Sequence, residues 1–396
     1  MAVNDVMDTS REQDWISLGL APFFARKMVE IYKNDPTGRS LPDDFMRSAG
    51  KWNSPESVEI SDIRIPGERG LSSVSAKLYR PVHERRKGSR DALLLWLHGG
   101  GFSQGSPLWP EAHAVCAEIC DRTGISCLNL DYALSRLDAE EGLFPQALEQ
   151  VVSAWLWAGD SLSKNELGNL SQEVSFFLGG ASAGANLAAA ACLKINQDRL
   201  AGQTRLKSPQ GFFSVYGLFC RLASLEGDYE NRLAALLPDP LRFTDQDCLT
   251  MYRDYCGLDS VVLEKDRGLV IPGQGDLSNF PPAWLIACQW DDLAGMTFAF
   301  DRALKAEGIP THSYQAAGML HGFFNWYPTP ELPESLHALD FLCQGIKESL
   351  LKRKEAATTS TQGLRLIPAD RIQTEGGGHN LNPRIAFLQI STWESQ

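Results

Sequence analysis

After residue 57 the sequence repeats one pattern, in which short apolar runs alternate with longer stretches of helical character. Residues 93–97 are apolar at every position, which is typical of a strand buried on both faces of a sheet. We expect strands over residues 58–63, 74–79, 93–97, 125–130, 174–178, 212–215, 283–288 and 311–315, and helices over 112–121, 144–159, 183–197 and 296–307. This alternation predicts an α/β fold with a mostly parallel central sheet flanked by helices.

Three segments lie outside the alternation. Residues 1–50 have helical character, with Phe24, Met28 and Tyr32 spaced four apart on one face. Residues 218–280 combine Gly/Pro-rich stretches with a helical stretch over 243–255, for which Thr244 can serve as N-cap. We expect these two segments to form a helical cap over the carboxyl edge of the sheet of one α/β domain spanning 51–350. We expect residues 351–396 to form a flexible C-terminal tail with a polar linker at 356–363, although residues 385–390 could form one strand.

Charge and cysteine content restrict the partners and the compartment. The chain of 396 residues has 37 Lys and Arg against 49 Asp and Glu, so its net charge of −12 argues against a nucleic-acid partner. The sequence has no run of about 18 apolar residues that would span a membrane, and no secretory signal is visible. The nine cysteines form no C-x-x-C pair. We therefore expect free thiols and a cytoplasmic protein, with a homodimer as an open alternative to a monomer.

The strongest local motif is Gly180-Ala181-Ser182-Ala183-Gly184, which matches G-x-S-x-G. It lies between the expected strand 174–178 and the expected helix 183–197, as a nucleophile on a tight strand-to-helix turn requires. The glycines allow the sharp turn, and the start of the helix favours negative charge nearby. A Gly- and Ala-rich helix start with an incidental serine is the alternative interpretation.

A second motif, His98-Gly99-Gly100-Gly101-Phe102, directly follows the expected strand 93–97. Its three glycines expose backbone N–H groups that can stabilise an oxyanion, an interaction typically worth about 10²–10³ in rate. We expect His98 to orient the loop rather than to transfer a proton. The alternative is a flexible glycine turn.

An acid and a histidine follow two of the later strands. Asp291 and Asp292 come after the expected strand 283–288, and either of them could orient a histidine or cap the next helix. His321, in Met-Leu-His-Gly-Phe, follows the last expected strand and could act as a general base. Serine, acid and histidine in this order, each just after a strand, match the chain order of α/β-hydrolases.

With these motifs the chain resembles the hormone-sensitive-lipase-like esterases of the α/β-hydrolase superfamily over roughly residues 55–348. Asp131-Tyr132, Phe144-Pro145-x-Ala147-Leu148-Glu149, Phe243-Thr244-x-x-Asp247 and Leu277-x-x-Phe280-Pro281-Pro282 also resemble family segments. The resemblance implies Ser182 as nucleophile, His321 as base and Asp291, rather than Asp292, as the acid. It also implies oxyanion donors from Gly100, Gly101 and Ala183. The chain departs from the family at Ala181, where an acid is usual, and in the family's D-Y-R-L-A-P-E segment, which reads Asp131-Tyr132-Ala133-Leu134-Ser135-Arg136-Leu137 here.

These residues together predict a carboxylesterase-type serine hydrolase that cleaves small or medium hydrophobic esters through an acyl-enzyme. The sequence contains no H-E-x-x-H, P-loop or clustered Cys/His pattern, so we expect no metal or organic cofactor. The aromatic residues expected near the substrate, each of which could instead pack in the core, are Trp15, Phe23, Phe24, Phe102, Trp109 and Tyr216. Of these six, we assign Phe24, Phe102, Trp109 and Tyr216 to substrate binding. The alternatives are an acyltransferase or thioesterase with the same triad, or a non-hydrolytic cyclase or receptor. A dinucleotide-binding site is disfavoured because the glycines at 179, 180 and 184 do not have the G-x-G-x-x-G spacing.

Overall fold

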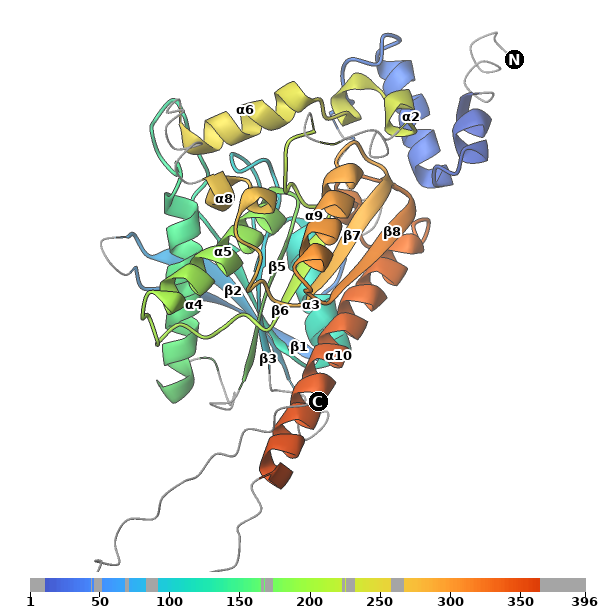
Figure 1. Ribbon diagram of the computed structural model, residues 1–396. Helices are drawn as coiled ribbons and strands as arrows, with labels where there is room; N and C mark the ends of the chain where they lie inside the picture. Colours follow the sequence, from blue (N-terminus) through green and yellow to red (C-terminus); the bar gives the residue numbers. More distant parts are fainter. Residues whose placement is uncertain are drawn as a thin grey trace, which may run out of the picture. The chain divides into compact units, whose positions relative to one another are not determined.

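The computed structural model describes residues 11–43, 45, 52–67, 71–82, 92–164, 167, 174–222, 225, 232–257 and 267–363. Within these residues the strands form one eight-stranded sheet in the order β1-β2-β4-β3-β5-β6-β7-β8 (Figure 1). The strands are β1 (Val58–Ile65), β2 (Val74–Pro81), β3 (Ala92–Leu97), β4 (Ser126–Asp131), β5 (Ser175–Ala181), β6 (Gly211–Val215), β7 (Ala283–Trp290) and β8 (Thr311–Leu320).

The pairing of the strands confirms the predicted fold class. β2 pairs antiparallel with both β1 and β4, and every other neighbouring pair is parallel. Each predicted strand is present, and the main difference is at the last one, which continues five residues further, to Leu320. In the extended part β8 pairs with β7 across a register shift between Cys288 and Trp290. Residues 316–320 contain Gly318, a residue typical of turns, so the sequence did not mark this stretch as strand.

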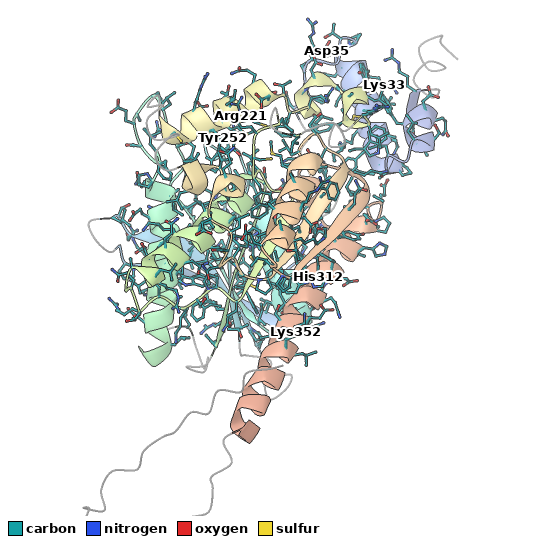
Figure 2. All side chains as sticks on the ribbon, viewed as in Figure 1. Lys33, Asp35, Arg221, Tyr252, His312 and Lys352 are labelled. Atoms are coloured by element: carbon teal, nitrogen blue, oxygen red, sulfur yellow. The ribbon has the colours of Figure 1, made fainter. Side chains whose placement is uncertain are left out.

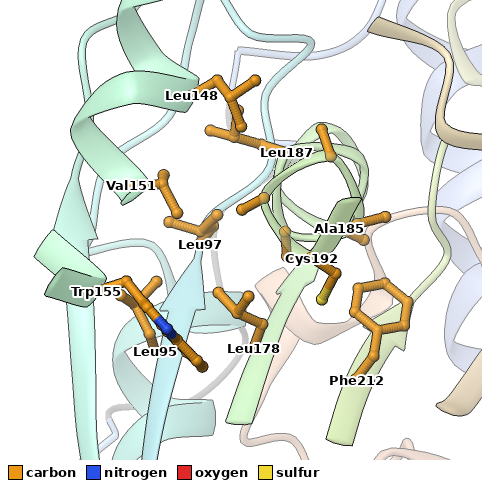
Figure 3. Packing of buried hydrophobic residues seen from close by; sticks show 14 of the residues in the cluster. Leu95, Leu97, Leu148, Val151, Trp155, Leu178, Ala185, Leu187, Cys192 and Phe212 are labelled. Carbon is orange, nitrogen blue, oxygen red and sulfur yellow. The ribbon is translucent and has the colours of Figure 1, made fainter. Parts of the chain in front are cut away.

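Two apolar cores lie on opposite faces of the sheet, because successive side chains of a strand point to opposite sides. Leu93, Leu95 and Leu97 of β3 belong to one core cluster, whereas Leu94 and Trp96 belong to the other. Figure 3 shows the first face, where Leu95 and Leu97 pack with Leu178 and Phe212 against side chains of the helices α4 (Gln146–Lys164) and α5 (Ala183–Leu200). α9 (Ala294–Ala306) adds to this core, and α3 (Pro110–Thr123) contributes to the other.

The segments at the carboxyl ends of the strands are short helices and loops. They are α2 (Pro22–Asn34), η3 (Ala234–Leu236), η4 (Asp239–Leu241), α6 (Asp245–Cys256), α8 (Arg267–Val270), η5 (Pro272–Gln274) and η6 (Phe323–Trp326). Thr244 caps α6 through a reciprocal capping box with Asp247, as predicted. Figure 2 labels Tyr252 and Arg221 beside α6; the Tyr252 hydroxyl donates to the Cys220 carbonyl and Arg221 pairs with Asp245, so α6 is fastened to the chain that follows β6.

The helix α10 (Glu334–Gly363) corrects one expectation for the C-terminal part of the chain. Residues 356–363 were expected to form a polar linker, but they continue this helix. Extending an existing helix needs no new nucleus, and Ala356 and Ala357 have high helix propensity. The chain divides into two compact units, Met1–Lys352 and Arg353–Gln396. The strand expected at 385–390 lies outside the described residues.

Candidate active site

Ser182 lies on the sharp turn between β5 and α5. Its backbone has φ 53° and ψ −121°, a conformation that non-glycine residues rarely adopt. The turn is held by a hydrogen bond from the Ser182 N–H to the Val215 carbonyl at 2.9 Å. A Cβ on Gly184 would lie 2.2 Å from the His98 carbonyl oxygen, and one on Gly180 would lie 2.6 Å from the Gly184 carbonyl carbon. Both glycines of the motif are therefore required by close backbone packing, not only by the turn.

His321 follows β8 and lies between the other two predicted residues. Its Nε2 is 2.9 Å from Ser182 Oγ, and its Nδ1 is 2.8 Å from Asp291 Oδ2. Asp291 directly follows β7, its side chain is completely buried, and its Oδ1 accepts a hydrogen bond from the Leu293 N–H at 2.9 Å. The structure thus brings Ser182, His321 and Asp291 into one hydrogen-bonded row, in the arrangement that a nucleophile, its base and an orienting acid need.

The neighbouring acid, Asp292, has a different set of partners. It forms a two-pronged ion pair with Arg242, with N–O distances of 2.8 and 3.0 Å, and its Oδ2 also accepts the Phe243 N–H at 2.8 Å. The Phe243 ring lies 4.8 Å from the His321 ring. Asp292 therefore fixes the 240–244 segment beside the histidine, while Asp291 contacts the histidine itself.

The surroundings of His321 shift its proton affinity in opposing directions. Burial lowers the pKa of His321, but the charge and hydrogen bond of Asp291, with the charge of the more distant Glu111, outweigh burial. The net effect is a pKa above the ordinary value of histidine. The Tyr216 ring packs 4.8 Å from the imidazole and holds its other side.

The glycine loop after β3 takes the conformation that its sequence allows. Gly100 and Gly101 have φ values of 113° and 59°, in the region that favours glycine. Within the described residues, no hydrogen-bond acceptor is assigned to the N–H groups of Gly100, Gly101 or Ala183. His98 is completely buried, stacks on Tyr132 at 4.3 Å, and burial lowers its pKa to about 4. A neutral, stacked ring fits the expectation that His98 orients the loop.

A cavity of about 360 Å³ opens onto Ser182 and His321. Of the four aromatic residues singled out as substrate-binding, Trp109 lines it. The other residues on its wall come from residue 41, the loop after β3, the start of α3, residues 240–251 and residues 320–326. They are Leu41, Gly100, Gly101, Ser103, Gln104, Glu111, Pro240, Leu241, Phe243, Met251, Leu320, Gly322, Asn325 and Trp326.

The structure places the other three expected substrate-binding residues in the core, which corrects their assignment to the pocket wall. Phe102 stacks on Tyr255 at 4.3 Å, Tyr216 lies behind His321, and Phe24 packs edge-on against Trp326 at 5.2 Å. All three are at most 1% exposed. Trp15 and Phe23 lie in the same core cluster as Phe24. Aromatic side chains bury a large apolar surface, and packing against other rings in the core is favourable for them.

Two buried polar residues that the sequence did not single out also border the cavity, Glu111 and Asn325. Glu111 stands in the first turn of α3, where an acid normally suits the helix dipole at the surface. Asn325 interrupts the apolar run Phe323-Phe324-Asn325-Trp326. A polar residue inside an apolar run is typical of a buried side chain that forms hydrogen bonds, and this pattern could have pointed to Asn325. The described residues contain no cluster of three or more His, Cys, Asp or Glu side chains suited to a metal ion.

The α/β-hydrolase class is defined by a mostly parallel sheet with a serine on a strained strand-to-helix turn. An acid and a histidine follow later in the chain, each after a strand, and form one hydrogen-bonded row with the serine. A family model described as the alpha/beta hydrolase fold matches residues 94–325. The chain belongs to the hormone-sensitive-lipase-like family of α/β-hydrolases, a family of carboxylic ester hydrolases, which confirms the resemblance drawn from the motifs.

Individual relatives agree with this assignment. The chain is 28% identical over 271 residues to the carboxylic ester hydrolase LipN of Mycobacterium tuberculosis, covering 68% of this chain and 65% of that protein, just under two thirds of its length. It is 26% identical to the versiconal hemiacetal acetate esterase of Dothistroma septosporum, over 77% of this chain and 85% of that one. The crystal structure of carboxyl esterase 2 from Tuber melanosporum shares the fold, with a TM-score of 0.64, 20% identity and coverage of 84% of this chain and 99% of that chain. No helix in the described part of the chain is long and apolar enough to cross a membrane.

Proposed function

We propose that this protein hydrolyses small or medium hydrophobic carboxylic esters, with Ser182 as nucleophile, His321 as general base and acid, and Asp291 as the residue that orients His321. One observation carries the proposal: the His321 ring joins Ser182 Oγ, at 2.9 Å, to Asp291, at 2.8 Å, at the wall of a cavity that also exposes the glycine loop. The relatives named as ester hydrolases support the same reaction class.

In the first half of the reaction, Ser182 Oγ attacks the ester carbonyl carbon while its proton passes to His321 Nε2. The negative charge that develops on the carbonyl oxygen is stabilised by the N–H groups of Gly100, Gly101 and Ala183. His321 then gives its proton to the leaving alcohol oxygen, the C–O bond breaks, and an acyl group remains on Ser182. Asp291 accepts the Nδ1–H and stabilises the charged imidazole in between.

In the second half, water takes the place of the alcohol. His321 accepts a proton from water, and the hydroxide oxygen attacks the acyl carbon. The protonated His321 then returns a proton to Ser182 Oγ as the carboxylic acid leaves, which restores the starting state. Each half uses the same base and the same N–H groups, so every proton and electron pair is accounted for without another reactant.

The wall of the cavity supports an uncharged substrate. The side chains that border it include Leu41, Leu241, Phe243 and Met251, and none of the described residues that line it is Lys or Arg. Its volume of about 360 Å³ lies toward the lower end of the range of small-molecule sites. An apolar wall stabilises a hydrocarbon chain. A substrate with a carboxylate or phosphate would find no Lys or Arg among these residues to pair with its charge, so an uncharged substrate is favoured.

A series of p-nitrophenyl esters from acetate to palmitate tests this function. We expect turnover of the acetate-to-octanoate members and a steep loss at palmitate, because the cavity cannot enclose a long chain. The measurement is kcat/KM for each ester by release of nitrophenolate. Labelling of Ser182 by a fluorophosphonate without turnover of any ester would contradict hydrolysis of carboxylic esters and favour an acyltransferase, a thioesterase or a cyclase.

The pH dependence of kcat/KM should reflect the state of His321. The base must be neutral to accept the serine proton, so activity rises with pH through the pKa of His321. Since Asp291 and Glu111 raise that pKa, the midpoint of the acid limb should lie above the ordinary histidine value of about 6.5. The check is a pH profile of kcat/KM, with enzyme held at each pH and then assayed at neutral pH to exclude inactivation. A midpoint below about 6 would contradict this assignment of the base.

A further inference from the structure

Glu111 is a buried carboxyl group beside the active site that the proposed reaction does not use. It is the second residue of α3 and only 2% exposed. Placing a carboxylate in a protein interior costs several kcal/mol unless hydrogen bonds and charges compensate for the lost water. A well-packed apolar residue of similar size would serve stability at least as well. The presence of an acid at this position therefore calls for an explanation in terms of the neighbouring groups.

The two carboxylate oxygens of Glu111 accept three hydrogen bonds from three separate parts of the chain. Oε1 accepts the Gly99 N–H at 2.7 Å. Oε2 accepts the Tyr216 hydroxyl at 2.7 Å and the Asn325 side-chain amide at 3.1 Å. Burial raises the pKa of Glu111 above the ordinary carboxyl value, while these three hydrogen bonds and the charge of protonated His321 act in the opposite direction and favour the ionised form.

Each of the three donors is next to a group that the reaction needs. Gly99 begins the glycine loop and directly precedes the proposed oxyanion donors Gly100 and Gly101. Tyr216 has φ 41° and packs its ring 4.8 Å from that of His321. Asn325 lies in η6, which begins directly after the turn at His321 and Gly322. Glu111 is therefore hydrogen-bonded to the glycine loop and also to Tyr216 and Asn325, which lie beside His321.

The close approach of Glu111 to the loop also explains the first glycine of the motif. A Cβ on residue 99 would lie 2.7 Å from Glu111 Oε1 and 3.0 Å from the Ser182 Cβ. Gly99 has no need of positive φ, so its absence of a side chain is required by packing. Gly99 is thus packed closely against both the Glu111 carboxylate and Ser182.

We propose that Glu111 is a positioning residue: it fixes the glycine loop relative to His321 and supplies a second negative charge behind the imidazole. This inference rests on the proposed function, because it concerns the same reaction. The loop must present its N–H groups at hydrogen-bond distance from the oxyanion, and a displacement of about 1 Å can cost roughly 10²-fold in rate. One carboxylate accepts hydrogen bonds from the Gly99 N–H of the loop and from Tyr216 and Asn325 beside His321, so it fixes their relative positions.

The test compares the wild type with Glu111→Gln and with a control on the same helix, Glu118→Gln. Glutamine keeps the shape of Glu111 and can keep its oxygen toward the Gly99 N–H, while the Tyr216 hydroxyl and the Asn325 amide can turn to accept from its NH₂ group. The variant therefore retains partners for folding but loses the charge. Glu118 pairs with Arg122 at 3.0 Å and does not border the cavity in the described structure.

For Glu111→Gln we expect the rate of Ser182 labelling by a fluorophosphonate, and kcat for p-nitrophenyl butyrate, to fall about 10- to 100-fold with KM changed less than about threefold. The acid limb of its kcat/KM profile should move to lower pH, because one of the charges that favours protonated His321 is gone. Glu118→Gln should match the wild type in both. A folded Glu111→Gln protein that is labelled at the wild-type rate, with an unmoved acid limb, would overturn the inference.

Tyr216→Phe provides a second variant if Glu111→Gln does not fold. It removes one hydroxyl donor to Glu111 and keeps the ring against His321. We expect a fall of about 3- to 10-fold in kcat and in the labelling rate at constant KM, and full activity would overturn the inference. Wild-type protein that resists labelling would remove the proposed function and the inference with it, whereas labelled wild type with unaffected variants would remove the inference alone.

Discussion

Ser182→Ala should abolish labelling by a fluorophosphonate and lower kcat for p-nitrophenyl esters by about 10⁴- to 10⁶-fold. The substitution removes only the oxygen that lies 2.9 Å from His321 Nε2, and the Cβ that the turn already accommodates stays in place. The residual rate comes from the loop N–H groups and from binding, which remain. Mass spectrometry of the labelled protein and nitrophenolate release measure the two effects.

The control for this experiment is Ser153→Ala, a buried serine on α4. It should be labelled like the wild type, and both variants should keep the wild-type circular dichroism spectrum. Labelling of a folded Ser182→Ala protein at another serine, with ester turnover retained, would contradict the assignment of the nucleophile.

Asp291→Asn should lower kcat by about 10⁴-fold. Asparagine fits the same space, but its side-chain amide can donate to His321 Nδ1, which then carries no proton. The proton moves to Nε2 and faces Ser182 Oγ, so the ring can no longer accept the serine proton. Removing the negative charge also lowers the pKa of His321, since Asp291 is the main group that raises it.

Asp292→Asn is the matched control, because it makes the same chemical change at the next residue. It weakens the ion pair with Arg242 and the support of Phe243, which lines the cavity, so KM should rise by a few-fold while kcat stays within about tenfold of the wild type. Steady-state kinetics of the two variants side by side decide the matter. A severe loss for Asp292→Asn with a mild one for Asp291→Asn would reverse the roles assigned to the two acids.

The fold could be predicted from the sequence largely because the central strands are apolar on both faces. β3 has six buried residues in a row, and no surface helix or half-exposed strand tolerates that pattern. Ser182 and His321 could be predicted because each lies in a glycine-containing motif directly after a strand. The ends of the strands and helices were harder to predict than the elements themselves. Residues 316–320 are compatible with strand or loop, and only pairing with β7 makes them part of β8.

The rest of the site depends on contacts between residues far apart in the chain, which the sequence does not display. Asp291 and Asp292 are adjacent and chemically identical, so the residue pattern left both open and only the family resemblance favoured Asp291. In the structure His321 contacts Asp291 and Arg242 contacts Asp292. Phe102 ends the glycine motif and Tyr216 directly follows β6, but their rings turn into the core. Glu111 resembles an ordinary acid at a helix start until the folded chain brings Gly99 and Tyr216 to it.

The ion pair between Arg242 and Asp292 has a consequence for exchanging parts between related enzymes. Arg242 belongs to the segment between β6 and β7, whereas Asp292 belongs to the loop that carries the acid of the triad. A chimaera whose replacement segment has no arginine at position 242 leaves Asp292, which is 11% exposed, without this ion pair one residue from Asp291. The substrate-facing segment is therefore not an independent module, and residues 242 and 292 must be transplanted as a unit.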